Sequence, residues 1–277
     1  SFDGTDDYVD LGNTSALTIT GSVTLSAWVN FSNFDNSLAA VISKYSGTNG
    51  YNIEKTANEN KLSFWVGDGS DDIEVTSNTL SADTWYHVVG TNDGTNSKIY
   101  INGDLEATVA QGNPAGPTGD LKIGLCSTQS QSYRYWDGLI DEVAIWTSAL
   151  TSSEITALYN SGNGLDASSN SGNYTSSSNL QGYWKFNEDS SILYDHSGNQ
   201  NHGTINGATW VENMYGCTDS TAGNYDPDAE FDDGACYDGP TWYVSTAGSD
   251  TTGNGSEATP LGSIQLAIDF TSEGDTV

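Results

Sequence analysis

The side chains best suited to chemistry in this sequence are the carboxylates of a short acidic segment near residue 230. They belong to Asp226, Asp228, Glu230, Asp232 and Asp233. Alternate carboxylates in one loop can converge on a cation, much as positions 1, 3 and 5 of an EF-hand loop do. The segment is not an EF-hand, because Phe231 and Tyr237 stand where that motif has its Gly and its bidentate Glu. Like charges this close repel one another without a cation, so we predict calcium here. The alternative is a solvated acidic linker.

A second candidate calcium site joins Asp3 and Gly4 to Asp141. Calcium takes six to eight oxygen ligands, and a backbone carbonyl beside a glycine plus carboxylates is a workable partial set. These residues can meet only if the strands that carry them pair with each other. The alternative is that Asp3 caps a turn and Asp141 accepts backbone hydrogen bonds.

The third candidate site is a glycan-binding surface made of aromatic residues. In their strands, these residues occupy the positions between the alternating aliphatic residues. These aromatic residues are Trp28, Trp65, Tyr100 and Trp146. If they face the concave side of one sheet, they offer flat apolar platforms on which a sugar can pack. The alternative is that a curved sandwich buries the side chains on both faces of these strands.

Short alternating segments predict an all-β sandwich. Apolar residues fall on alternate positions from Val23 to Phe31, and the same period recurs at 62–66, 86–88 and 99–101. Turn dipeptides such as Asn102-Gly103 separate these segments. His87 lies in one of the apolar strands, so we expect it to be buried and hydrogen-bonded.

One short helix is predicted after these strands. Thr151 suits the N-cap, Glu154 completes a capping box, and Gly162 lies beyond the helix end. We expect this helix to pack on the sandwich.

The charge of the chain excludes two classes of partner. There are 37 acidic and 7 basic residues, which gives a formal net charge of -30. Such a field repels nucleic acid and anionic lipid. Bound divalent cations or a high-salt medium would neutralise it, and the alternative is that the charge only promotes solubility. No apolar run is long enough to span a membrane.

The three cysteines indicate the compartment. Cys217 and Cys236 flank the acidic segment and are expected to form a disulfide, which implies an oxidising, extracellular location. Cys126 follows Ile123 and Leu125 in alternation and is expected to be buried.

Two segments carry a resemblance to a known family. Residues 2–9 (FDGTDDYV) and residues 138–146 (GLIDEVAIW), the latter followed by 151–155, resemble the two ends of a laminin-G-like, concanavalin-A-like jelly roll. The resemblance implies a module that binds rather than catalyses. Glycoside hydrolases of this fold carry a Glu-x-Asp-x-x-Glu strand motif, which is absent here. Asp141 and Glu142 are adjacent and point to opposite faces of a strand.

We predict three regions along the chain. Residues 1–212 form the jelly roll, with a core at 1–162, a Ser/Asn/Gly-rich linker at 163–179 and an edge segment at 180–212. Residues 213–239 resemble Cys-linked acidic spacer repeats of bacterial surface proteins, and residues 240–277 resemble the N-terminal cap of a right-handed parallel β-helix.

The segment 180–212 resembles one that normally precedes the opening of the jelly roll. It either begins a second module or folds back as the missing edge of the first. We favour the second, because an isolated strand pair could not bury Tyr183, Trp184, Phe186 and Trp210. The module would then be circularly permuted.

We therefore predict a non-catalytic, calcium-stabilised recognition module of a secreted or surface-displayed bacterial protein. It would bind glycans or other cell-surface ligands and act in adhesion. One alternative is the substrate-targeting module of an enzyme that degrades polysaccharides and carries its activity on the β-helix. Another is a purely structural spacer. The sequence does not determine the oligomeric state.

Overall fold

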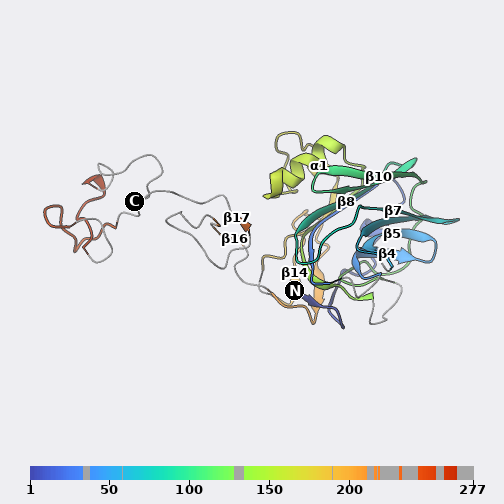
Figure 1. Cartoon of the computed structure of the whole chain (residues 1–277), viewed down its shortest axis with the longest axis horizontal. Coiled ribbons are helices and arrows are strands. Elements are labelled where there is room, and N and C mark those ends of the chain that lie inside the picture. The colour runs from blue at the N-terminus through green and yellow to red at the C-terminus, as the bar shows by residue number, and fades with distance from the viewer. Residues whose placement is uncertain are drawn as a thin grey trace. The chain divides into compact units, whose positions relative to one another are not determined.

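The computed structural model divides the chain into two units, residues 1–210 and 211–277 (Figure 1). It describes all residues except 34–37, 58, 128–133, 189, 211–214, 217, 219–230, 233–242, 254–258 and 267–277. Unit 1 is a sandwich of two antiparallel sheets, called here sheet A and sheet B, with one α-helix. The predicted all-β jelly roll with a single short helix is confirmed for this unit.

Sheet A has seven strands in the order β1-β12-β3-β8-β9-β10, and β13 pairs with β12 on the same edge as β1. The long alternating run at 23–31 forms β3 at the centre of this sheet. The strand bounds are β1 (Phe2–Asp3), β3 (Val23–Phe31), β8 (Tyr86–Asn92), β9 (Asn96–Ile101), β10 (Asp104–Ala110), β12 (Asp137–Trp146) and β13 (Leu180–Trp184).

Sheet B has eight strands in the order β14-β15-β2-β11-β4-β5-β6-β7. The strand bounds are β2 (Tyr8–Asp10), β4 (Ala40–Ser46), β5 (Asn49–Lys55), β6 (Leu62–Asp68), β7 (Asp72–Thr76), β11 (Lys122–Ile123), β14 (Ile192–Leu193) and β15 (Gly203–Asn206). Alternate residues of these strands, such as Ile53, Phe64 and Val75, enter the core between the sheets. The residues between them face away from the core.

Helix α1 (Ser152–Tyr159) begins at the predicted N-cap. The Thr151 side chain accepts from the Glu154 backbone N–H, and the Glu154 side chain accepts from the Thr151 backbone N–H. Figure 1 shows α1 on the side of the sandwich formed by β8 and β10, away from β4, β5 and β7. Ile155 and Leu158 of α1 belong to a second apolar cluster that includes Tyr100 and Trp146 of sheet A. The helix therefore covers the outer face of sheet A.

The segment 163–206 is also built into unit 1. Ala167 and Tyr174 are buried in the cluster beneath α1, although this stretch has the composition of a linker. Strand β13 then joins sheet A, and β14 and β15 join sheet B. One stretch of chain thus supplies strands to both sheets.

Unit 2 contains little regular structure in its described part. Strand β16 (Tyr215–Gly216) pairs in parallel with β17 (Phe231–Asp232), and an isolated parallel bridge joins Val244 to Leu261. The spacer repeat and the β-helix cap stay predictions. None of the helices among the described residues reaches the length and hydrophobicity needed to cross a bilayer.

Candidate functional site

The loop between β1 and β2 holds the candidate calcium site of Asp3 and Gly4. Strand β1 pairs with β12, with Phe2 opposite Gly138 and Asp3 opposite Asp137. The pairing of end strands that the metal prediction required is therefore present. Gly4 has a positive φ of 74° and lets the chain leave β1 in a tight turn.

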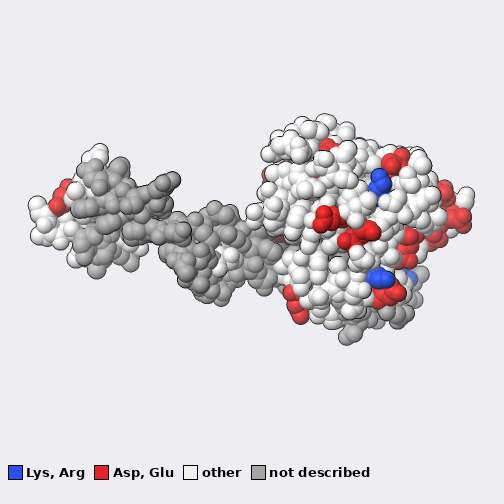
Figure 2. Space-filling model, turned by 45° about the horizontal axis from the view of Figure 1, so that its top comes forward, with Lys and Arg blue, Asp and Glu red and all other residues white. Residues whose placement is uncertain are grey.

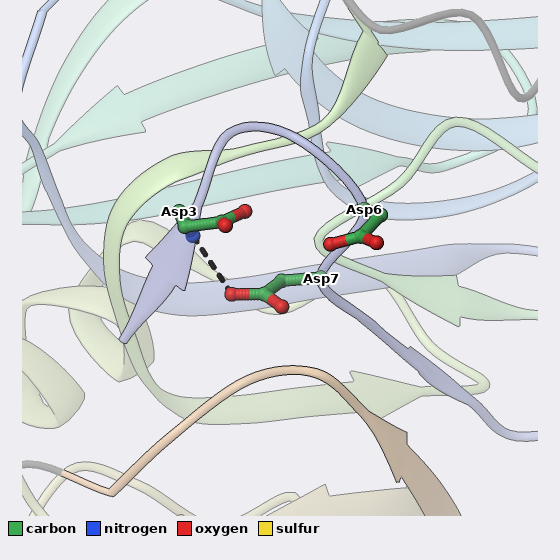
Figure 3. A group of neighbouring side chains, drawn as sticks. All are labelled: Asp3, Asp6 and Asp7. Atoms are coloured by element: carbon green, nitrogen blue, oxygen red, sulfur yellow. Dashed lines mark hydrogen bonds between the residues drawn. The ribbon is translucent and has the colours of Figure 1, made fainter.

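Three carboxylates meet in this loop (Figure 3). Asp3, Asp6 and Asp7 each place one oxygen within 4.8 Å of the others. Figure 3 shows the Asp3 and Asp6 carboxylates pointing toward each other across the loop. Asp7 Oδ2 accepts a hydrogen bond of 2.9 Å from the Asp3 backbone N–H. Hard oxygen ligands at this spacing are a partial calcium site.

Asp7 is the buried member of this group. Burial raises the pKa of its carboxyl, and the nearby Asp3 and Asp6 charges raise it further. The hydrogen bond from the Asp3 backbone N–H lowers it in part. The position of Asp7 depends on Gly207, because a Cβ added there would lie 2.0 Å from Asp7 Oδ1. A cation would favour the ionised form of this carboxyl and relieve the repulsion.

Asp141 lies outside the group of three. The register between β12 and β3 shifts between Asp141 and Ala144, and Glu142 adopts a positive φ of 48° in this β-bulge. Asp141 Oδ1 accepts from the Glu142 backbone N–H at 2.8 Å. This contact is the one expected from the alternative interpretation, in which Asp141 accepts backbone hydrogen bonds. Sequence reasoning missed Asp6 and Asp7, although they follow Asp3 within one turn.

The acidic segment of unit 2 cannot be compared with its prediction. Asp226, Asp228, Glu230 and Asp233 lie outside the described residues, as do Cys217 and Cys236. Only the backbone of Asp232 is described, in β17. The calcium site of the acidic segment and the disulfide stay predictions.

Three of the four predicted aromatic platforms are buried beneath α1 and the segment that follows it. Trp28 stacks on Tyr159, Tyr100 Oη lies 3.2 Å from Ser152 Oγ, and Trp146 Nε1 donates to Tyr174 Oη. This burial corrects the expectation of exposed rings at Trp28, Tyr100 and Trp146. Trp65 differs, because it lies on the outer face of sheet B and is partly exposed.

A surface depression of about 520 Å³ lies on the outer face of sheet B. Tyr8 and Asp10 of β2 alternate with the buried Val9, and Thr204 and Asn206 of β15 stand opposite Asp10 and Tyr8. The other lining residues are Leu11, Gly12, Asp120 and His202. Sequence reasoning missed this site, because its two strands are nearly two hundred residues apart in the chain.

The Tyr8 ring has two close neighbours. Lys122 Nζ lies 4.9 Å from its centroid, and the Tyr135 ring centroid lies 6.5 Å away. Next to this ring, the depression offers carboxylate, amide, hydroxyl and imidazole groups. An aromatic ring beside several hydrogen-bonding groups suits a polyhydroxylated ligand.

Acidic groups dominate the surface of unit 1. Figure 2 shows Asp and Glu at many places on the visible face and Lys or Arg at few. This face therefore disfavours anionic ligands and favours neutral or cationic ones.

Comparison with known proteins agrees with the fold. Residues 3–156 match the family described as the concanavalin A-like lectin/glucanases superfamily. The search of curated proteins gave no significant match.

Parts of this chain are similar to several solved structures. One is a candidate carbohydrate-binding protein from Bacteroides ovatus ATCC 8483, with 22% identity and a TM-score of 0.57, covering 74% of this chain. This chain spans only 58% of that protein. The heptameric SAP-like pentraxin of Limulus polyphemus is 15% identical with a TM-score of 0.41, covering 57% of this chain and 84% of its own. Botulinum neurotoxin type C, whose cell entry depends on two ganglioside molecules, is 18% identical with a TM-score of 0.40, covering 52% of this chain and 36% of its own.

Proposed function

Because the chain belongs to the concanavalin A-like lectin/glucanases superfamily, we propose that its jelly roll is a non-catalytic module that binds glycans in the depression on sheet B. The observation that carries this proposal is the pairing of β2 with β15. It places the Tyr8 ring and Asn206 side by side, with Asp10 and Thr204 in the next row. A sugar can pack its C–H face on the ring while its hydroxyl groups bond to the polar side chains. The proposed setting is extracellular, on a secreted or surface-displayed protein that acts in adhesion.

Replacing Tyr8 by Ala is expected to weaken glycan binding at least about tenfold, since truncating a central aromatic contact commonly costs more than 1 kcal/mol. The measurement is titration calorimetry of the full chain with oligosaccharides selected on a glycan array. Tyr8→Phe keeps the ring and should keep most of the affinity. Asn206→Ala tests the polar side of the same site. Unchanged affinity in both Tyr8→Ala and Asn206→Ala would remove the depression as the binding site.

We also propose that calcium stabilises unit 1 through the carboxylates of Asp3, Asp6 and Asp7. A ligand present at a hundredfold excess over its dissociation constant stabilises the folded state by about 2.7 kcal/mol. Calcium should therefore raise the thermal midpoint relative to chelator at matched ionic strength. The rise should disappear in Asp3→Asn/Asp6→Asn and persist in Asp104→Asn, an exposed carboxylate on β10.

Two further variants locate the ion if the calcium response has another origin. Asp141→Asn tests the bulge of β12, and Asp228→Asn/Asp232→Asn tests the acidic segment of unit 2. A midpoint for unit 1 that is the same in calcium and in chelator would refute the proposed ion.

A further inference from the structure

Away from the depression, the outer face of sheet B carries a second polar and aromatic group on β5, β6 and β7. Trp65 of β6 stands directly opposite Asn52 of β5 and Glu74 of β7. Directly paired residues project on the same side of a sheet. Their sequence neighbours Ile53, Phe64 and Val75 enter the core, so this side is the outer one. Trp65, Asn52 and Glu74 therefore form one row.

The side chains of this row are linked to those of the next. Asn52 Nδ2 donates to Glu54 Oε2 at 3.2 Å, and Trp65 Nε1 donates to Ser63 Oγ at 3.1 Å. Glu54 and Ser63 are themselves a directly opposed pair. The five residues are thus one connected group on the face of three adjacent strands.

Asn52 holds a polar atom that this group leaves unsatisfied. The residue is 3% exposed, and its Oδ1 accepts no hydrogen bond from the described residues. An unpaired buried acceptor costs about 1–3 kcal/mol, and native proteins retain few of them. The atom is closed off from solvent, so a donor from a ligand would satisfy it only after a neighbouring side chain moves aside.

The group also holds two carboxyls, Glu54 and Glu74. Glu54 is 4% exposed, and burial raises the pKa of its carboxyl to about 8, with Glu74 raising it further and Arg134 opposing the shift. Burial also raises the pKa of the half-buried Glu74. A carboxyl with a pKa of about 8 is largely protonated at neutral pH, so Glu54 adds no full negative charge. The Glu74 carboxylate, the unpaired carbonyl oxygen of Asn52 and the electron-rich face of the indole favour a ligand that supplies donors and positive charge.

We propose that Trp65, Asn52 and Glu74 form a second ligand subsite that takes a sugar residue bearing a free ammonium group. The indole face packs on the sugar ring and attracts the cation, the Glu74 carboxylate pairs with the ammonium, and Asn52 Oδ1 accepts from a hydroxyl group. This inference rests on the proposed glycan-binding function. It adds both a second location and a charge preference to that function.

The two subsites are far enough apart to be tested separately. Strand β2, which carries Tyr8, is separated from β6 by β11, β4 and β5. Four strand spacings of about 4.8 Å correspond to about 19 Å. A substitution in one subsite therefore leaves the contacts of the other intact.

The test is titration calorimetry of the full chain with a glucosamine tetramer and with its fully N-acetylated form. The ammonium-bearing tetramer is expected to bind more tightly, with an affinity that falls as salt is added. Trp65→Ala and Glu74→Gln should each weaken this binding at least about tenfold. Trp65→Phe, which keeps a ring, and Asp104→Asn, which removes an exposed charge on sheet A, should leave it within about twofold. Glu74→Gln preserves the shape of the side chain, so it carries the test if Trp65→Ala fails to fold.

The outcomes separate this inference from the proposed function. Loss of glucosamine binding in Tyr8→Ala, with wild-type binding in Trp65→Ala and Glu74→Gln, would place the ligand in the depression and overturn the second subsite. The second subsite also fails if wild-type protein binds neutral oligosaccharides but not the glucosamine tetramer. Loss of glucosamine binding in Trp65→Ala, with no effect of Tyr8→Ala or Asn206→Ala on any glycan, would support the subsite and refute the depression.

Discussion

Replacing Trp184 by Ala is expected to lower the free energy of unfolding of unit 1 by about 3–5 kcal/mol, the usual cost of truncating a buried tryptophan. Trp184 ends β13 and is fully buried in the main core. Its Nε1 donates to the Asn201 carbonyl at 2.9 Å, so the indole also anchors the loop that leads to β15. Chemical denaturation of the wild type and the variant gives the difference directly.

A control for this prediction lies in the same segment. Ile192 of β14 is 41% exposed, and Ile192→Ala should change the free energy of unfolding by no more than about 0.5 kcal/mol. Equal stability of Trp184→Ala and Ile192→Ala would mean that the segment 180–206 is not part of the folded core.

The stability of unit 1 is expected to fall steeply in acid because of His87. This side chain is buried against Trp28 and Tyr159, with ring centroids at 5.2 and 6.2 Å, and burial lowers its pKa from 6.5 to about 3. Below pH 6.5 the unfolded chain takes up a proton at His87 that the folded chain does not. The stability contributed above pH 6.5 is therefore lost progressively down to about pH 3, by about 5 kcal/mol in total.

His87→Gln removes this proton uptake, and its unfolding free energy should vary less between pH 6.5 and pH 3 than that of the wild type. Ser26→Ala serves as the control, because it removes the hydroxyl that lies 2.8 Å from His87 Nε2 and keeps the imidazole buried. Identical pH profiles of the unfolding free energy for wild type and His87→Gln would contradict the assignment of the acid sensitivity to His87.

Local sequence signals predicted the elements of this fold well. The alternation at 23–31 is β3 over its whole length, and the residues Thr151 and Glu154 form the capping box of α1. Both signals depend on residues close together in the chain, where periodicity and side-chain chemistry are sufficient.

Burial of the aromatic rings could not be predicted in this way. Alternation correctly places Trp28 and Trp146 on the face opposite the main core, but it does not reveal what covers that face. The covering residues are Tyr159 of α1 and Tyr174, which lies in a stretch with the composition of a linker. Tyr174 is an isolated aromatic among small polar residues, and tertiary packing alone determines its position.

The candidate sites depend on long-range register and on an irregular strand. The depression exists because Asn206 pairs with Tyr8, and no local pattern encodes that pairing. Asp141 lies outside the carboxylate group, at a bulge in which Glu142 has a positive φ. A Glu in the left-handed region is uncommon, so a sequence pattern does not predict it.

The hydrogen bond between the Thr209 backbone N–H and the Ser1 carbonyl, at 3.0 Å, has a mechanical consequence. This bond holds Ser1, the first residue of unit 1, beside Thr209, the last residue but one of the same unit. In the sequence, the strands of both sheets lie between these two residues. A force that pulls these two residues apart would load the nearest hydrogen bonds one after another, not all together. We expect unit 1 to peel open at low tension.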